Sequence, residues 1–158
     1  MSGMSKIVKT ISSITFPLIT IYGLYVIAHG HLTPGGGFQG GAIVASGCAM
    51  ILVSYGSIWT MNRVKEKNLS ILESLGAVCF ILLALLGLGF GTVFFNNFLV
   101  GTNSLFGVVP AVGSGLADIN TGGVIPLMNF AVGLKVIAGL FGIVLVMAYA
   151  SRTKEGKK

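Results

Sequence analysis

Four long runs of apolar residues, separated by polar or glycine-rich segments, dominate the pattern along the chain. The runs cover about residues 11–28, 38–59, 74–95 and 124–150. Each is close to the roughly 20 apolar residues that an α-helix needs to cross a hydrocarbon core about 30 Å thick. Because lipid offers no partners to the backbone of an open strand, the pattern predicts an all-α fold. It is expected to be one integral membrane domain over residues 1–158, with four transmembrane helices.

Basic residues mark one end of each predicted helix. Nine of the ten Lys and Arg residues flank these ends: Lys6, Lys9, Arg63, Lys65, Lys67, Arg152, Lys154, Lys157 and Lys158. The opposite loops, residues 29–37 and 96–123, contain none. Cytoplasmic loops of membrane proteins carry the excess of Lys and Arg. The distribution therefore predicts that both termini and the linker between the second and third helices are cytoplasmic.

Composition excludes several other classes of protein. The chain of 158 residues is 54% hydrophobic and 9% charged, whereas soluble domains carry about 25% charged residues. So few polar groups cannot cover a water-facing surface, which excludes a soluble enzyme and a disordered chain. The net charge of +6 comes from short tracts between apolar runs, so no basic face is available to bind nucleic acid.

A glycine-rich segment, HGHLTPGGGFQGG at residues 29–41, joins the first two runs. Pro34 lacks a backbone N–H and biases the residue before it toward extended geometry, so the first helix is expected to end there. Gly35, Gly36 and Gly37 then permit a tight reversal with positive φ values.

Two interpretations of this segment follow from its small residues. Two pairs have the spacing that lets another helix approach closely: Gly36/Gly40 and Gly37/Gly41. The simpler interpretation is a tight helical hairpin with a packing seam. The sharper one adds an opening for ions or protons, lined by backbone, His29 and His31.

Other chemistry fits these residues poorly. A nucleotide fingerprint needs a strand before its glycines and an acid about 20 positions after them, and neither is present. His29 and His31 lie together at the end of one helix, so they cannot face each other across a haem. Cys48 and Cys79 are isolated in apolar runs, which indicates packing rather than an iron–sulfur ligand set. No cofactor and no metal site are expected.

Lys135 is the one basic residue inside an apolar run. It lies about eleven residues into the fourth run, which at 1.5 Å per residue places it roughly 16–18 Å from the outer end, near mid-membrane. A charge at that depth costs on the order of 2.5–3.5 kcal/mol, and the position is too central for easy snorkelling. Three arrangements remain: a water-filled path, a lysine neutralised by desolvation, or a carboxylate supplied by another subunit.

The acidic residues offer Lys135 no obvious partner. Glu73 is expected at the cytoplasmic mouth of the third helix, where the positive helix terminus favours an acid; it is also a candidate ionisable residue of an ion pathway. The other acids lie in cytoplasmic segments or in the outer loop: Glu66, Asp118 and Glu155. The outer loop, residues 96–123, is long and apolar, which indicates packing on a partner protein or a short re-entrant segment.

Two segments together resemble a known family. The string at residues 29–41 resembles the hallmark of the MnhB-like family, the MnhB subunits of Mrp-type Na⁺/H⁺ antiporters, and NFAVGLK at residues 129–135 is similar to that family's last-span motif. The resemblance covers almost the whole chain, with the same order of motifs. It implies a small non-redox subunit of a large hetero-oligomer that exchanges Na⁺ for H⁺ across a prokaryotic plasma membrane.

The resemblance also leaves alternatives. Similar modules with this subunit type are built into archaeal membrane-bound hydrogenases and sulfur-reducing complexes, and the chain does not distinguish them. A structural adaptor that carries no ion is a different class; a stand-alone channel would be a poor pore with one central charge. On the main interpretation, Lys135 is the protonatable or charge-pairing group of the ion pathway, with His29 and His31 near its outer mouth. The junction is shaped by Pro34, Gly35, Gly36, Gly37 and Phe38.

Overall fold

The computed structural model describes residues 4–32, 34–90, 93–102, 105–108 and 120–155. Within them the fold is helical, with α1 (Lys6–Ala28), α2 (Gly36–Tyr55), α3 (Ser57–Arg63), α4 (Glu66–Phe90) and α5 (Ile125–Glu155). Four of these helices are long and apolar enough to cross a membrane, namely α1, α2, α4 and the part Ile125–Ser151 of α5. The prediction of four candidate spans is therefore confirmed, with α3 as an additional short helix.

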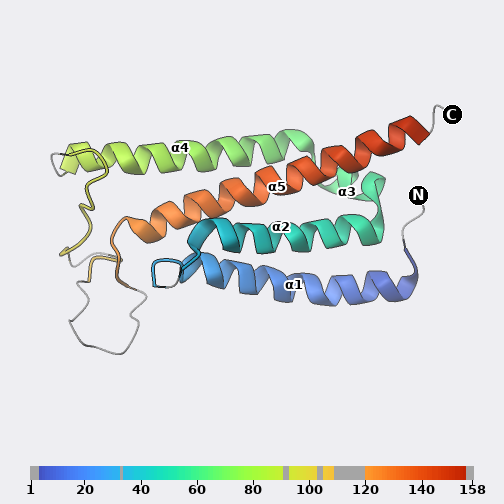
Figure 1. Cartoon of the computed structure of the whole chain (residues 1–158), viewed down its shortest axis with the longest axis horizontal. Coiled ribbons are helices and arrows are strands. Elements are labelled where there is room, and N and C mark those ends of the chain that lie inside the picture. Colours follow the sequence, from blue (N-terminus) through green and yellow to red (C-terminus); the bar gives the residue numbers. More distant parts are fainter. Residues whose placement is uncertain (1–3, 33, 91–92, 103–104, 109–119, 156–158) are drawn as a thin grey trace.

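The four long helices lie side by side in the order α1, α2, α5, α4 (Figure 1). α5, the last helix in the sequence, therefore packs on both α2 and α4. Both termini and α3 lie at one end, which we call the basic end because Lys6, Arg63 and Lys67 lie in its helix termini. The link between α1 and α2 lies at the other end, the junction end. The orientation of the two ends in the membrane stays a prediction.

Two helix boundaries differ from the prediction, for different reasons. The second run, expected as one helix over residues 38–59, is interrupted at Gly56, where φ is 90° and α2 ends. The third helix, expected over residues 74–95, instead spans Glu66–Phe90. Its polar first turns are helical because Leu69 is buried in the core with residues of α2 and α5, and because Glu66 favours a helix N-terminus.

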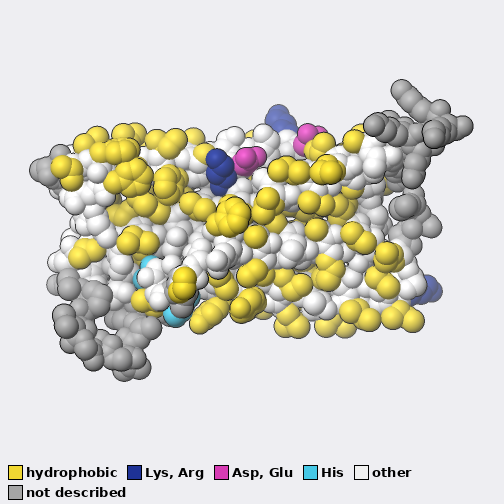
Figure 2. Space-filling model, viewed as in Figure 1, with side chains coloured by type: hydrophobic (Ala, Val, Ile, Leu, Met, Phe, Trp, Pro, Cys, Tyr) yellow, Lys and Arg dark blue, Asp and Glu magenta, His cyan; other side chains and the backbone are white. Residues whose placement is uncertain are grey.

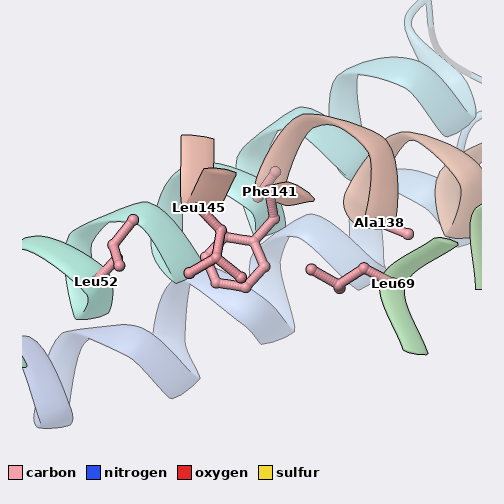
Figure 3. Packing of buried hydrophobic residues seen from close by; sticks show 6 residues of the cluster. Leu52, Leu69, Ala138, Phe141 and Leu145 are labelled. Carbon is pink, nitrogen blue, oxygen red and sulfur yellow. The ribbon is translucent and has the colours of Figure 1, made fainter. Parts of the chain in front are cut away.

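The hydrophobic core lies toward the basic end, where α2, α4 and α5 meet. Leu52, Leu69, Ala138, Phe141 and Leu145 pack together there (Figure 3). Leu145 has no exposed surface and Leu52 is 3% exposed. This cluster holds α4 against α5 and so sets which residues of the two helices meet further along.

Toward the junction end, glycine takes the place of large core side chains. α2 buries five glycines, Gly36, Gly37, Gly40, Gly41 and Gly47. Large apolar side chains point outward instead; in α1, Ile7 is 72% and Ile21 is 66% exposed. Small residues inside and large apolar residues outside are typical of helices that associate in lipid, where close backbone packing rather than apolar burial drives association.

The described parts of the loop over residues 96–123 fold back on the start of α5. The side-chain amide of Asn97 donates to the carbonyl oxygen of Gly122 (3.0 Å), and its side-chain oxygen accepts from the N–H of Val124 (2.8 Å). A distant side chain thus caps α5. In these residues the loop packs on its own chain, whereas the sequence indicated a partner or a re-entrant segment. Asp118 lies outside the described residues.

Candidate functional site

α4 and α5 are in backbone contact at Gly76. A Cβ atom placed on Gly76 would lie 2.7 Å from the carbonyl oxygen of Ala131 and 2.9 Å from the amide nitrogen of Lys135. Real Cβ atoms do not come so close to backbone atoms, so only glycine allows this approach. We call this contact surface the α4–α5 seam. It fixes the backbone of Lys135, whose side chain is exposed on the surface of the subunit.

Glu73 lies one turn before Gly76 and reaches across the seam. Its carboxyl carbon lies 3.5 Å from the place of a Cβ on Gly139, one turn after Lys135. Glu73 therefore lies about one helical turn from Lys135 along the seam, on the opposite helix, and each of the two packs against a glycine of the other helix. Figure 2 shows a basic and an acidic side chain next to each other midway along this face. Among the described residues, neither Glu73 nor Lys135 forms an ion pair within 4.0 Å.

This position corrects the prediction that Glu73 lies at the mouth of its helix. α4 begins at Glu66, seven residues earlier, which places Glu73 about 10 Å inside the helix at 1.5 Å per residue. The inference that the chain has no acid near the depth of Lys135 is wrong for the same reason. The sequence pattern set the start of the third helix two turns too late.

A groove of about 400 Å³ runs from Glu73 toward the basic end along the seam. We call it the acidic groove; its lining residues are Glu66, Leu69, Ser70, Glu73, Ala138, Gly139, Gly142, Ile143, Val146 and Met147. Glu66, Ser70 and Glu73 share one face of α4 because they are spaced at the helical period. Opposite them, Gly139 and Gly142 leave the space between the helices open. Two carboxylates thus line the groove, and the inner one, Glu73, lies about one turn from Lys135.

The reversal at the junction end depends on glycine backbone geometry. Gly35 has φ 137° and Gly36 has φ 57°, in the region that side-chain-bearing residues rarely adopt. α1 ends at Ala28 and α2 begins at Gly36, as the sequence around Pro34 predicts. Phe38 is 59% exposed, so its ring projects from the subunit rather than filling the junction.

Glycines also bring α2 into backbone contact with a helix on each side. A Cβ on Gly40 would lie 2.6 Å from the carbonyl oxygen of Gly23 in α1, and one on Gly41 would lie 3.0 Å from that of Gly133 in α5. Gly37 and Gly41 thus both face α5, whereas Gly40 faces α1.

The side chain of Asn129 enters the junction from α5. A Cβ on Gly36 would lie 2.9 Å from Oδ1 of Asn129, and one on Gly30 would lie 3.0 Å from its Nδ2. A Cβ on Gly37 would collide with the backbone oxygen of Asn129. The amide thus occupies space that only glycines at the end of α1 and the start of α2 leave free.

The two histidines flank Gly30, the residue that lies against this amide. The ring of His29 stacks near Tyr25, with centroids 5.2 Å apart, and the ring of His31 meets Phe106 edge-on at 6.5 Å. Both ring nitrogens of His31 and Nδ2 of Asn129 are buried and lack a hydrogen-bond partner among the described residues. Buried nitrogens of this kind are normally satisfied by water or an ion. The junction therefore combines glycine packing with buried polar nitrogens.

The predicted site residues form two groups linked by α5. Lys135 and Glu73 lie on opposite sides of the seam, while His29, His31 and the glycines lie at the junction. Asn129 belongs to the junction and lies six residues, about 9 Å, before Lys135 along α5. Sequence reasoning missed Glu66 and Ser70 as groove residues, although their helical spacing from Glu73 is visible in the sequence. The described residues contain no cluster of three or more His, Cys, Asp or Glu suited to a metal ion.

Known proteins are similar to this chain. The uncharacterized protein MJ1307 of Methanocaldococcus jannaschii is 37% identical over 146 residues, which cover 89% of this chain and 52% of that protein. The chain therefore spans about half the length of this curated relative. A chain of the membrane-bound sulfane sulfur reductase (MBS), an archaeal respiratory membrane complex, has a TM-score of 0.68 and 28% identity. That similarity covers 93% of this chain and 61% of the other.

A family model gives the assignment. The model described as a domain related to the MnhB subunit of Na⁺/H⁺ antiporter matches residues 7–142. The match includes both the glycine junction and the α4–α5 seam. The chain therefore belongs to the family of domains related to the MnhB subunit of Na⁺/H⁺ antiporters.

Proposed function

We propose that this chain is the MnhB-like subunit of an antiporter-like module in a respiratory membrane complex of a prokaryotic plasma membrane. In this role it is a non-redox subunit that contributes part of a pathway for Na⁺ or H⁺. Its family and its similarity to a chain of the archaeal sulfane sulfur reductase support this. The large apolar side chains exposed on every long helix need lipid and partner subunits to cover them.

The observation that carries the proposal is the placement of Glu73 and Lys135 across a glycine-lined seam. Ionisable residues inside a membrane are costly, and they mark ion and proton pathways. Here two residues of opposite charge lie about one turn apart across the seam, and they form no ion pair within 4.0 Å in the described chain. Because no ion pair holds the two groups together, each of them can bind a cation, a proton or water.

The charges suggest how the pair couples two ions. The acidic groove brings a cation from the basic end to Glu73. A cation at Glu73 and a proton on Lys135 repel each other, and this repulsion is strong where water is scarce. Occupancy of one position therefore disfavours occupancy of the other, which is the coupling that exchange of Na⁺ for H⁺ requires.

A free Mrp-type antiporter is the second candidate, because the family is described by the MnhB subunit of an antiporter. The similarity to a chain of a respiratory complex favours the built-in module. Affinity purification of the tagged chain from native membranes separates the two. Redox subunits in the purified assembly are expected for the module, and antiporter subunits alone would indicate the free antiporter.

The experiment that tests the pathway uses the assembled complex in sealed vesicles. Lys135→Met and Glu73→Gln are each expected to reduce Na⁺-dependent proton movement at least about tenfold, since removing one charge of a low-dielectric pair costs more than about 1.4 kcal/mol. The exchanged variant K135E/E73K is expected to recover part of this activity. Lys67→Met, an exposed lysine at the start of α4, is the control.

Assembly must be measured beside transport. Each variant complex is compared with wild type on a native gel, and transport is expressed per intact complex. Wild-type exchange by both Lys135→Met and Glu73→Gln, with normal assembly, would contradict a role in the pathway. The chain would then be a structural adaptor that holds its partners and carries no ion.

A further inference from the structure

A second groove, outside the acidic groove and the junction, opens near the basic end. It has a volume of about 370 Å³ and lies where α1, α2, α3 and α5 meet. Its apolar walls include Phe16 of α1, Ile51 of α2 and Phe141 of α5. We call it the aromatic groove because Tyr55 and Trp59 also line it.

The rim of this groove is polar and cationic. Tyr55 and Trp59 stack with ring centroids 4.4 Å apart. The guanidinium of Arg63 lies 5.3 Å from the centre of the Trp59 ring, and the ammonium of Lys9 lies 5.6 Å from that of Tyr55. The hydroxyls of Tyr55 and Ser13 are 2.7 Å apart and hydrogen-bonded. In the described chain, neither Lys9 nor Arg63 forms an ion pair with a carboxylate.

The groove lies at the end of the candidate membrane span α2, so we expect it near the boundary between hydrocarbon and headgroups. α2 ends at Tyr55, and the break at Gly56 (φ 90°) starts α3 in a new direction. Tyr and Trp are enriched at this interface because their rings sit at headgroup level. Basic pockets between transmembrane helices bind anionic head groups on the cytoplasmic side of membranes. The rim therefore has two cations where a lipid phosphate would lie.

The size of the groove favours a lipid chain over a protein segment. A helix with its side chains is about 10 Å across, so about 370 Å³ would hold roughly one helical turn. A hydrocarbon chain is thin enough to enter between Phe16 and Ile51. The charge of the rim matches a phosphodiester, and the apolar walls match the chain attached to it.

We propose that the aromatic groove binds one anionic phospholipid from the leaflet at the basic end. Its phosphate lies between Lys9 and Arg63, and one hydrocarbon chain lies along Phe16, Ile51 and Phe141. Bound there, the lipid contacts α1, α2, α3 and α5, and it fastens the short α3 to the spans. This site is separate from the proposed ion pathway and does not depend on it.

The test uses the assembled complex in nanodiscs that contain a photoreactive phosphatidylglycerol or, separately, a photoreactive phosphatidylcholine. After illumination, labelling of this chain is located by mass spectrometry. Wild type is expected to be labelled by phosphatidylglycerol at peptides that contain Phe16 or Ile51. The variant K9Q/R63Q is expected to lose about tenfold of that labelling, because charge-assisted contacts to a phosphate are about twice as strong as neutral ones.

Two further variants separate the site from general surface charge and from misfolding. K65Q/K67Q removes the same charge from the basic end outside the groove lining, and is expected to be labelled like wild type. Ile51→Trp fills the groove and is expected to lose the label with both cations in place.

Three results would overturn the proposal. The first is equal labelling by phosphatidylcholine, and the second is equal loss of label in K9Q/R63Q and K65Q/K67Q. The third is loss of a partner subunit from K9Q/R63Q on a native gel, which would make the groove a protein-docking surface. Transport by the Lys135 and Glu73 variants is read separately, so failure here leaves the proposed function standing.

Discussion

At the scale of single residues, glycine decides where this chain can bring two backbones together. Gly40 and Gly89 show the contrast within helices of the same molecule. A Cβ on Gly40 would lie 2.6 Å from both the carbonyl oxygen of Gly23 and Cγ1 of Ile27, whereas a Cβ on Gly89 meets nothing within 4 Å. Replacement of glycine by alanine therefore overpacks the α1–α2 contact at Gly40, whereas at Gly89 it changes only the helix propensity.

Gly40→Ala is expected to destabilise the chain in its complex by about 1–3 kcal/mol, the usual cost of forcing extra atoms into a close-packed contact. Gly89→Ala is expected to be neutral or to stabilise by up to about 1 kcal/mol, because alanine is the better helix former. The measurement is the fraction of intact complex after heating in detergent, followed on a native gel. Equal thermal stability of the two variants would show that α1 and α2 do not touch at Gly40.

At the scale of helices, the sequence predicts the existence of the spans better than their limits. Long apolar runs predict four helices because the bilayer sets their length. The break at Gly56 depends on one residue with φ 90°, and apolarity continues through it. The start of α4 depends on burial of Leu69 against other helices, which is tertiary information. The placement of Glu73 across the seam, about one turn from Lys135, could not be predicted either, because it follows from that start and from the register of α4 on α5.

The register of α1 on α2 is open to a direct test. The hydroxyls of Ser12 and Ser54 form a buried hydrogen bond of 2.5 Å. Cysteines at both positions would bring their sulfur atoms within reach of a disulfide, whose Cβ atoms are typically about 3.5–4.5 Å apart. In a background with Cys48 and Cys79 replaced by Ala, S12C/S54C is expected to oxidise in the membrane.

Oxidation is measured with maleimide-polyethylene glycol, which labels free thiols after denaturation and slows the labelled chain on a gel. A disulfide prevents this labelling, so the oxidised variant runs without the shift. S12C/S46C is the matched control, because Ser46 is exposed on α2 and its hydroxyl bonds only the carbonyl of Ile43 among the described residues. This control is expected to remain doubly labelled. Full labelling of S12C/S54C under oxidising conditions would contradict the packing of α1 on α2.

At the scale of the whole molecule, the polar features are separated along its length. The junction end holds Asn129 and the histidines, the seam holds Lys135 and Glu73, and the acidic groove continues to the basic end. Large apolar side chains surround them on the outside. The polar residues form two groups linked by α5, and the exposed apolar surface needs neighbours to cover it, which agrees with a small part of a larger membrane complex.

Which end of the molecule faces the cytoplasm decides where the acidic groove opens, and single cysteines can determine that orientation. Because Lys and Arg are retained on the cytoplasmic side during insertion, cysteines at Ser5 and Lys65 are expected to be cytoplasmic and one at Leu105 external. Each cysteine is introduced into a chain whose native cysteines are replaced. In sealed right-side-out vesicles, a membrane-impermeant maleimide should label only Leu105→Cys. Labelling of all three after solubilisation controls for coverage by partner subunits. The reverse pattern would place the mouth of the acidic groove outside the cell, so that cations would reach Glu73 from the external medium.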